Sequence, residues 1–172
     1  MRSLRNLVLL LLITPFALTQ VTQPAALPAV SGYALDRTKV ALPADFASPL
    51  NLLILLFQRD QEPQVDAWAL AVRDVVGMQV WLMPVSAREN GVYRWWLNAS
   101  FRSNLPTAQP RHFVLPVYVN KPQFLGALQV GSEKDVVVLL TDKAGKVLWR
   151  TSGPVADDKK MALMNFVRSS GH

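Results

Sequence analysis

The chain has no cysteine among its 172 residues. This absence excludes disulfide bonds, thiol catalysis, cysteine-ligated zinc and attachment as a lipoprotein. Histidine is scarce as well, because only His112 and His172 occur and His172 ends the chain. The residue spacings of a zinc protease, an EF-hand and a phosphate-binding loop are missing too. We therefore expect no metal and no cofactor.

The charge of the chain is only mildly basic, at +6 from 18 basic and 12 acidic residues. No run of lysine and arginine forms a stripe, which argues against a nucleic-acid partner. The small excess leaves room for weak association with an anionic membrane surface. Hydrophobic residues make up 51% of the chain and charged residues 17%, which indicates a folded domain behind an apolar leader.

The first residues have the pattern of an export signal. Arg2 and Arg5 precede the apolar run Leu7–Ile13, which is shorter than the roughly 20 residues of a membrane-spanning helix. Cleavage of this leader and its retention as an anchor both remain open. We expect residues 1–29 to be a signal peptide or N-terminal anchor plus a proline-containing linker, and residues 30–172 to form one domain. The protein is then periplasmic or attached to the inner membrane.

The central feature of the chain is a strand, a polar turn and a helix in residues 51–76. Leu52–Phe57 is an apolar run with the length of a buried strand. Pro63 suits the first turn of a helix, and Gly77 suits a helix C-cap. Residues at helical spacing indicate one buried face, formed by Val65, Trp68, Ala69, Val72 and Val76.

Strand and helix patterns alternate along the rest of the chain. The strand patterns cover residues 33–36, 39–42, 79–85, 113–119, 136–141 and 146–151. The helix patterns cover residues 91–103, 120–128 and 157–168. We expect Pro84 to end its strand, Pro116 to place its strand at a sheet edge, and Gly131 to close the second helix. This order predicts an α/β fold with a mixed central sheet and helices on both faces.

The order of elements resembles the thioredoxin-like fold, in the branch of peroxiredoxins and membrane-anchored thioredoxins. The resemblance covers about residues 32–168 and rests on the hairpin 32–46, the strand–turn–helix unit and residues 136–153. It implies a three-layer sandwich with an N-terminal β-hairpin and a C-terminal β-hairpin plus helix. The chain lacks both the reactive CxxC pair at the helix N-terminus and, in residues 132–136, the proline that shapes the substrate groove of redox thioredoxins.

Three segments also resemble the mitochondrial assembly-factor family that helps build the membrane sector of ATP synthase. They are Phe57–Trp68, Tyr118–Leu128 and Val138–Gly153. That family is thioredoxin-like, lacks the redox pair and acts as a chaperone for a membrane subunit. The resemblance implies a protein client and assigns no catalytic residue. The leader of this chain is bacterial in style.

The first candidate binding site is the turn that replaces the redox motif. Arg59, Asp60 and Glu62 lie there, and loops on a rigid scaffold commonly carry function. The alternative is a structural role, in which Asp60 or Glu62 caps the helix and Arg59 pairs with these carboxylates.

The second candidate site lies on the predicted helix 91–103. Arg94, Trp95 and Arg102 fall outside its buried stripe, and tryptophan and arginine are enriched at binding hot spots. The alternative is that the following loop covers Trp95.

These observations predict a non-catalytic, redox-inactive protein that is exported to the cell envelope and binds a protein client. Its specific role would be an assembly chaperone for a membrane complex. The alternative is a degenerate relative of the oxidoreductases that serves as a structural or regulatory subunit or binds a small ligand. We do not expect an enzyme, because no catalytic constellation replaces the missing cysteines.

Overall fold

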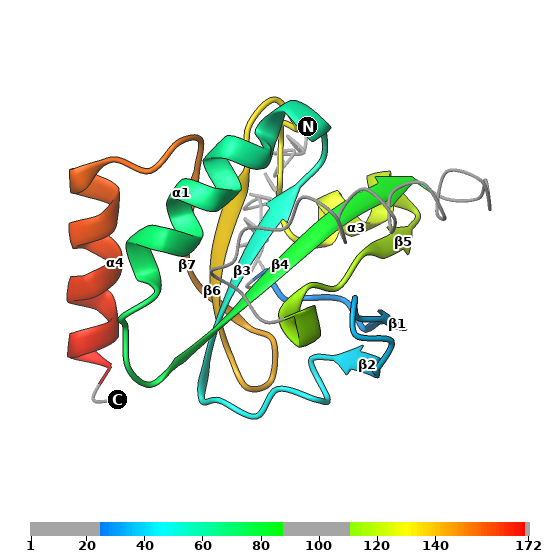
Figure 1. Cartoon of the computed structure of the whole chain (residues 1–172), viewed down its shortest axis with the longest axis horizontal. Helices are drawn as coiled ribbons and strands as arrows, with labels where there is room; N and C mark the ends of the chain where they lie inside the picture. The colour runs from blue at the N-terminus through cyan, green and yellow to red at the C-terminus, as the bar shows by residue number, and fades with distance from the viewer. Residues whose placement is uncertain (1–24, 88–110, 171–172) are drawn as a thin grey trace, which may run out of the picture.

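The computed structural model describes residues 25–87 and 111–170 (Figure 1). Its strands are β1 (Val30–Tyr33), β2 (Lys39–Leu42), β3 (Leu50–Leu56), β4 (Met78–Ala87), β5 (Val117–Val119), β6 (Val137–Asp142) and β7 (Val147–Ser152). Its α-helices are α1 (Glu62–Val72), α3 (Lys121–Ala127) and α4 (Asp157–Ser169). Short 3-10 helices cover Arg59–Gln61 and Arg111–Phe113. The predicted helix 91–103 lies outside the described residues.

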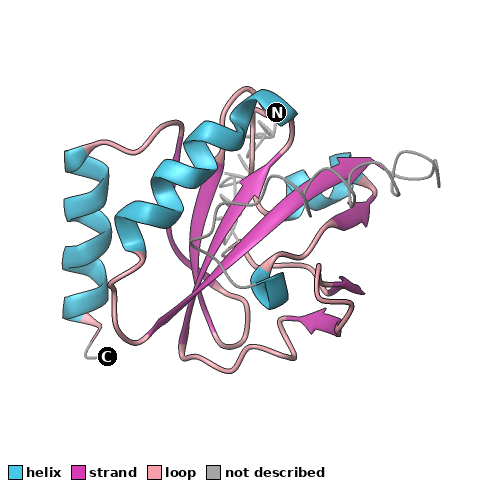
Figure 2. Cartoon of the chain, viewed as in Figure 1, coloured by secondary structure: helices cyan, strands magenta, loops and turns pink. Residues whose placement is uncertain are grey.

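Five strands form one mixed sheet in the order β5-β4-β3-β6-β7 (Figure 2). The β3–β4 and β4–β5 pairs are parallel, whereas β6 pairs antiparallel with both β3 and β7. β1 and β2 form a separate antiparallel hairpin. The predicted mixed sheet with an N-terminal hairpin and a C-terminal hairpin is confirmed.

Strand β3 is the centre of the sheet, and all of its residues are buried. Leu53 and Leu55 face the layer formed by the β1–β2 hairpin and α3. Leu52 and Ile54 face the opposite layer, formed by α1 and α4. Both faces are thus covered, as Figure 1 shows. Such burial on both faces is the reason for an uninterrupted apolar run, and the predicted three-layer sandwich is confirmed.

Helix α1 ends earlier than its apolar pattern predicts. Four members of the predicted stripe are buried, but Val76 is 88% exposed because the helix stops at Val72. The Arg73 N–H bonds the Leu70 carbonyl at 3.5 Å, three residues back, as in the tightened last turn of many helices. Gly77 adopts φ 83° in the turn that leads into β4, so its expected role as a helix C-cap is wrong.

Pro84 lies inside β4, where we expected it to end the strand. Leu115 N–H donates to the Leu82 carbonyl at 2.9 Å, so the backbone groups of Leu82 point toward β5. Because these groups alternate along a strand, the nitrogen of Pro84 also points toward β5. Regular pairing with β5 begins at Val85, after an isolated bridge between Leu82 and Val114, so Pro84 with its missing N–H lies in the gap between them. β5 is short and lies at the sheet edge, as Pro116 predicts.

The residue that closes helix α3 is not the glycine that the sequence predicts. Asn120 caps α3 as predicted, accepting a hydrogen bond from the Gln123 N–H at 3.3 Å. The residue in the left-handed conformation after the helix is Gln129, with φ 53°, and not Gly131. We call residues 129–136, which lead from α3 into β6, the entry loop.

The described chain is already packed at its first residues. Ala25 and Leu27 are buried, and Ala26 forms an antiparallel bridge with Lys146 at the start of β7. No helix in residues 25–87 and 111–170 is long and apolar enough to cross a membrane.

Candidate functional site

The turn between β3 and α1 occupies the position where the resemblance places a redox site. β3 ends at Leu56, a single 3-10 turn follows at Arg59–Gln61, and α1 begins at Glu62. Pro63 lies in the first turn of α1, where its missing N–H leaves no bond unmade. The turn therefore presents the N-terminal end of α1 close to the end of the central strand.

Gln61 is the residue that holds this turn together. Its side chain is buried, with 2% of the residue exposed. Its Oε1 accepts hydrogen bonds from the Phe57 N–H at 2.7 Å and from the Gln58 N–H at 3.3 Å. Its Nε2 donates to the Glu133 carbonyl of the entry loop at 2.7 Å. One amide thus satisfies two backbone donors at the end of β3 and one backbone acceptor 72 residues away.

Two more glutamines reach toward the same loop. Gln58 Nε2 lies 3.4 Å from the Glu133 carbonyl, and Gln64 Nε2 lies 3.4 Å from Asp135 Oδ1. These bonds are longer than those of Gln61 and are correspondingly weaker. We refer to Gln58, Gln61 and Gln64 as the glutamine cluster. It joins the start of α1 to the entry loop.

The entry loop is also tied to α3 by charge. Lys121 Nζ forms an ion pair with the Glu133 carboxylate, and it lies 5.8 Å from the centroid of the Phe57 ring. The Lys121 side chain is 17% exposed, so this pair is partly shielded from solvent. Glu133 is therefore held on both sides, with its carbonyl bound by the glutamine cluster and its carboxylate by Lys121.

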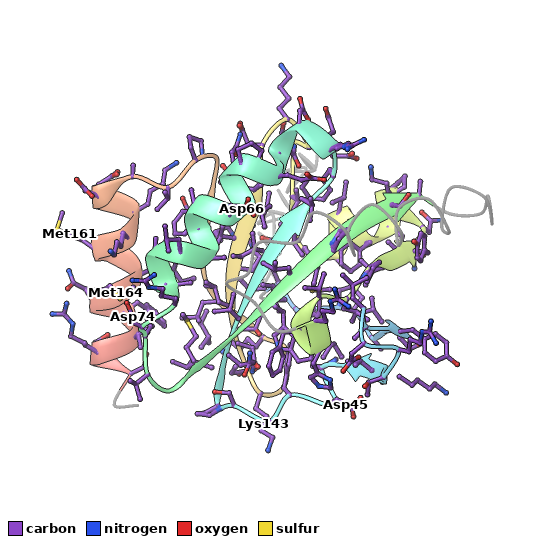
Figure 3. The ribbon with its side chains drawn as sticks, viewed as in Figure 1. Asp45, Asp66, Asp74, Lys143, Met161 and Met164 are labelled. Atoms are coloured by element: carbon purple, nitrogen blue, oxygen red, sulfur yellow. The ribbon has the colours of Figure 1, made fainter. Side chains whose placement is uncertain are left out.

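The predicted site residues of this turn lie together on the surface. Arg59, Asp60 and Glu62 line an open hollow with Pro63 and Asp66. Figure 3 labels Asp66 on the outer side of α1. Burial raises the pKa of the Asp66 carboxyl. The residues that line the hollow include no thiol, hydroxyl, amine or imidazole, and its ionisable groups are carboxylates and a guanidinium.

The start of α1 is capped, but not by the carboxylates that the structural alternative named. Neither Asp60 nor Glu62 accepts a capping bond at the start of α1. The caps come from the glutamines, because Gln58 and Gln61 form a reciprocal capping box around the 3-10 turn. Asp60 is exposed and Glu62 is half-buried. Arg94, Trp95 and Arg102, the second predicted group, lie outside the described residues.

Sequence reasoning missed the glutamine cluster. The available signal is spacing, because Gln58 and Gln61 stand three residues apart, as the two cysteines of a CxxC motif do. Their common partner could not be found from the sequence, since Glu133 lies far along the chain and contributes only its backbone carbonyl.

His112 has a partner that the sequence did not indicate. Its Nδ1 lies 3.0 Å from Asp36 Oδ2, which ties the β1–β2 hairpin to the segment before β5. A backbone hydrogen bond from Thr38 and the contact with His112 lower the pKa of the Asp36 carboxyl. The described residues hold no group of three or more metal-ligating side chains. This pair is therefore a link between two segments.

Comparisons with known proteins identify the fold. No protein-family model matches the chain, and no curated protein matches it. Among solved structures, a pneumococcal surface-exposed lipoprotein thioredoxin from Streptococcus pneumoniae superposes with a TM-score of 0.56 at 10% identity, covering 82% of this chain and 99% of its own. The thioredoxin domain of a thiol-disulfide oxidoreductase from Bacteroides vulgatus gives 0.56 at 16% identity, covering 84% and 98%.

A thiol:disulfide interchange protein from Chlorobium tepidum gives a TM-score of 0.54 at 15% identity, covering 85% of this chain and 95% of its own. These likenesses show that the chain has a thioredoxin-like fold. Its solved neighbours are oxidoreductases by name, whereas this chain has no cysteine. The fold is shared and the thiol chemistry is excluded.

Proposed function

We propose that this is a non-catalytic, redox-inactive thioredoxin-like protein that binds a protein client in the cell envelope. The observation that carries the proposal is Gln61. At the N-terminal end of α1, where a thioredoxin-like enzyme needs a reactive thiolate, this buried amide is bonded to its own backbone and to the entry loop. Because the Gln61 side-chain amide already makes three hydrogen bonds within the protein, the turn has a structural role.

The proposal extends to location and client class. The leader favours export to the periplasm or retention at the inner membrane. The resemblance to assembly factors of ATP synthase favours a chaperone whose client is a subunit of a membrane complex. Exposed Arg59 and Asp60 and half-buried Glu62 are the described surface that we assign to client contact, with Arg94, Trp95 and Arg102 as a second group.

The test is crosslinking of the full-length protein in cells, followed by membrane fractionation and mass spectrometry. We expect membrane-complex subunits to be captured by the wild type. The variant Arg59→Ala/Asp60→Ala/Glu62→Ala should lose at least half of this capture at an unchanged melting temperature.

A matched control removes the same charges elsewhere, at exposed Lys143, Asp74 and Asp158. Figure 3 labels Lys143 and Asp74 away from the hollow. This control should capture clients as the wild type does. A wild-type protein that captures nothing, or disulfide reductase activity of the purified protein, would contradict the proposal.

A further inference from the structure

Strand β7 forms one edge of the five-stranded sheet. The Gly153 N–H donates to the Val136 carbonyl at 2.9 Å, so the backbone of Gly153 points toward β6. Backbone groups alternate along a strand. The groups of Thr151, which stands opposite Val138, therefore also point toward β6. Those of Arg150 and Ser152 must point away from the sheet.

The outward backbone groups of β7 are largely unpaired. No described residue bonds the N–H or the carbonyl of Arg150, or the N–H of Ser152. The Ser152 carbonyl accepts a bond from Lys159 Nζ at 2.7 Å. Unpaired groups in a row along an edge strand are a template for another extended chain.

The same edge already binds an extended segment near its other end. Val147 N–H donates to the Ala25 carbonyl at 2.9 Å, and Leu27 N–H donates to the Gly145 carbonyl at 2.8 Å. This pairing is antiparallel and reaches β7 only at its first residues. This edge therefore pairs with an extended segment at its first residues. From Arg150 to Ser152, no described residue pairs with the edge.

A groove of about 470 Å³ runs beside the open part of the edge. Arg150 and Ser152 line it from the strand, and Ser132 and Asp135 line it from the entry loop. Arg150 Nη1 donates to the Gln129 carbonyl at 3.1 Å. An arginine has five N–H donors, and this bond uses one of them, so the guanidinium of Arg150 has donors left for a carboxylate.

We propose that an extended segment of the client polypeptide adds to β7 as an antiparallel sixth strand, with an acidic side chain opposite Arg150. This inference rests on the proposed client-binding function and names where the client docks. Backbone hydrogen bonds to Arg150 and Ser152 supply sequence-independent affinity, and the Arg150 guanidinium selects for acid. The site is separate from the glutamine cluster.

The probe is a fluorescein-labelled peptide, Ser-Thr-Val-Glu-Val-Thr-Ser, titrated with the full-length protein and followed by fluorescence anisotropy. A second peptide replaces the glutamate by lysine, and a third carries N-methyl groups on alternate backbone nitrogens. We expect saturable binding of the acidic peptide, about five-fold weaker binding of the lysine peptide, and none of the N-methylated one.

Two variants of the protein test the backbone and the charge separately. Ser152→Pro removes an N–H that the sheet does not use, and we expect about ten-fold weaker binding of every peptide. Arg150→Glu should reverse the preference, so that the lysine peptide binds better than the acidic one. Lys143→Glu makes the same charge change at the exposed β6–β7 turn and should leave both affinities as in the wild type.

Three results would overturn the inference. The first is no binding of the acidic peptide by the wild type at millimolar protein. The second is an unchanged preference in Arg150→Glu. The third is a wild-type dimer in sedimentation that Ser152→Pro abolishes, because the edge then serves a second copy of the chain. In cells, clients captured equally by the wild type and both variants would refute this docking site alone, whereas a wild type that captures none would refute the proposed function.

Discussion

Two regions of the same sheet differ in whether their backbone polar groups are hydrogen-bonded within the protein. At the end of β3, the N–H groups of Phe57 and Gln58 are bonded by the buried side chain of Gln61. At the edge of β7, the backbone of Arg150 has no partner among the described residues. The first region uses its polar groups for internal structure, and the second is open among the described residues.

This difference indicates which polar groups a ligand can reach in a thioredoxin-like chain that has no redox cysteines. Each polar group that is bonded internally is unavailable to a ligand, because a client would have to break that bond first. The glutamine cluster bonds the Glu133 carbonyl beside the turn between β3 and α1. An unpaired strand edge has no such cost. We therefore expect the two regions to respond differently to substitution.

Trp68 connects the two regions and should give the largest effect. It is fully buried under α1, and its Nε1 donates to the Gly153 carbonyl at 2.9 Å, just beyond the end of β7. Trp68→Ala leaves a cavity and an unpaired carbonyl, so the free energy of unfolding should fall by about 3–5 kcal/mol. Urea denaturation followed by circular dichroism measures this loss.

The control for Trp68 keeps an aromatic ring, smaller than the indole, and removes the donor. Trp68→Phe should cost about 1–3 kcal/mol, mainly through the unpaired Gly153 carbonyl. Equal losses for the two variants would show that the hydrogen bond, and not the packing, links α1 to β7.

The next largest effect is expected at Gln61. Gln61→Ala removes three hydrogen bonds and leaves the donors at the end of β3 unsatisfied, so stability should fall by about 2–3 kcal/mol. Gln64→Ala, whose bonds are longer and partly exposed, should cost about 0.5 kcal/mol. Thermal melts of both variants side by side would reveal the order, and a reversed order would refute the central place of Gln61.

The variant Gln61→Glu tests the role of Gln61 through the pH dependence of stability. The new carboxylate would face the Glu133 carbonyl, which accepts but cannot donate, so the folded state favours the protonated acid. Its folded pKa then lies above its unfolded pKa, and stability is present below the unfolded value and lost as pH rises through the folded one. Unfolding midpoints from pH 4 to pH 8 should therefore fall for this variant relative to the wild type.

A smaller effect is expected for the ion pair that closes the entry loop from α3. Lys121→Ala should cost about 0.5–1 kcal/mol, since Glu133 is about a third exposed and solvent screens the pair. Lys143→Ala, at an exposed turn position, serves as the control and should cost nothing measurable. Both values follow from urea denaturation at low salt, and the difference between them should shrink at 1 M salt.

The smallest effect is expected at Asp36, which is exposed. Its folded pKa is lowered by the Thr38 N–H and by His112, so its contribution is present above the unfolded pKa and lost as pH falls through the folded one. Asp36→Asn should therefore be slightly less stable than the wild type at neutral pH and equal to it in acid. Melting temperatures across the acidic range would show whether the two curves converge.

The elements that were predictable are those whose signal is local. The apolar run of β3 and the helical spacing around Trp68 are local sequence signals. The structure confirms the run and four of the five stripe residues, Val76 being exposed. The early end of α1 and the passage of β4 through Pro84 were missed. The helix ends in a tightened last turn, and Pro84 lies in a gap of the pairing between β4 and β5.

The candidate site was predictable only in its position. Its exposed residues, such as Arg59, follow from the polar turn, but the organising residue Gln61 does not. Glutamine is common in surface turns, and only the fold brings the Glu133 carbonyl within reach of its side chain. The same holds for the edge of β7, since which strand lies outermost is decided by topology and not by the strand's own sequence.

The most direct test of this account is amide hydrogen exchange in the full-length protein by NMR. The account predicts slow exchange for the Phe57 and Gln58 amides in the wild type, and exchange at least about ten-fold faster in Gln61→Ala but not in Gln64→Ala. The amide of Leu53 in β3 corrects for the change in global stability. Rapid exchange of Phe57 and Gln58 in the wild type, or exchange unaltered by Gln61→Ala after that correction, would contradict the claim that Gln61 holds the turn between β3 and α1 together.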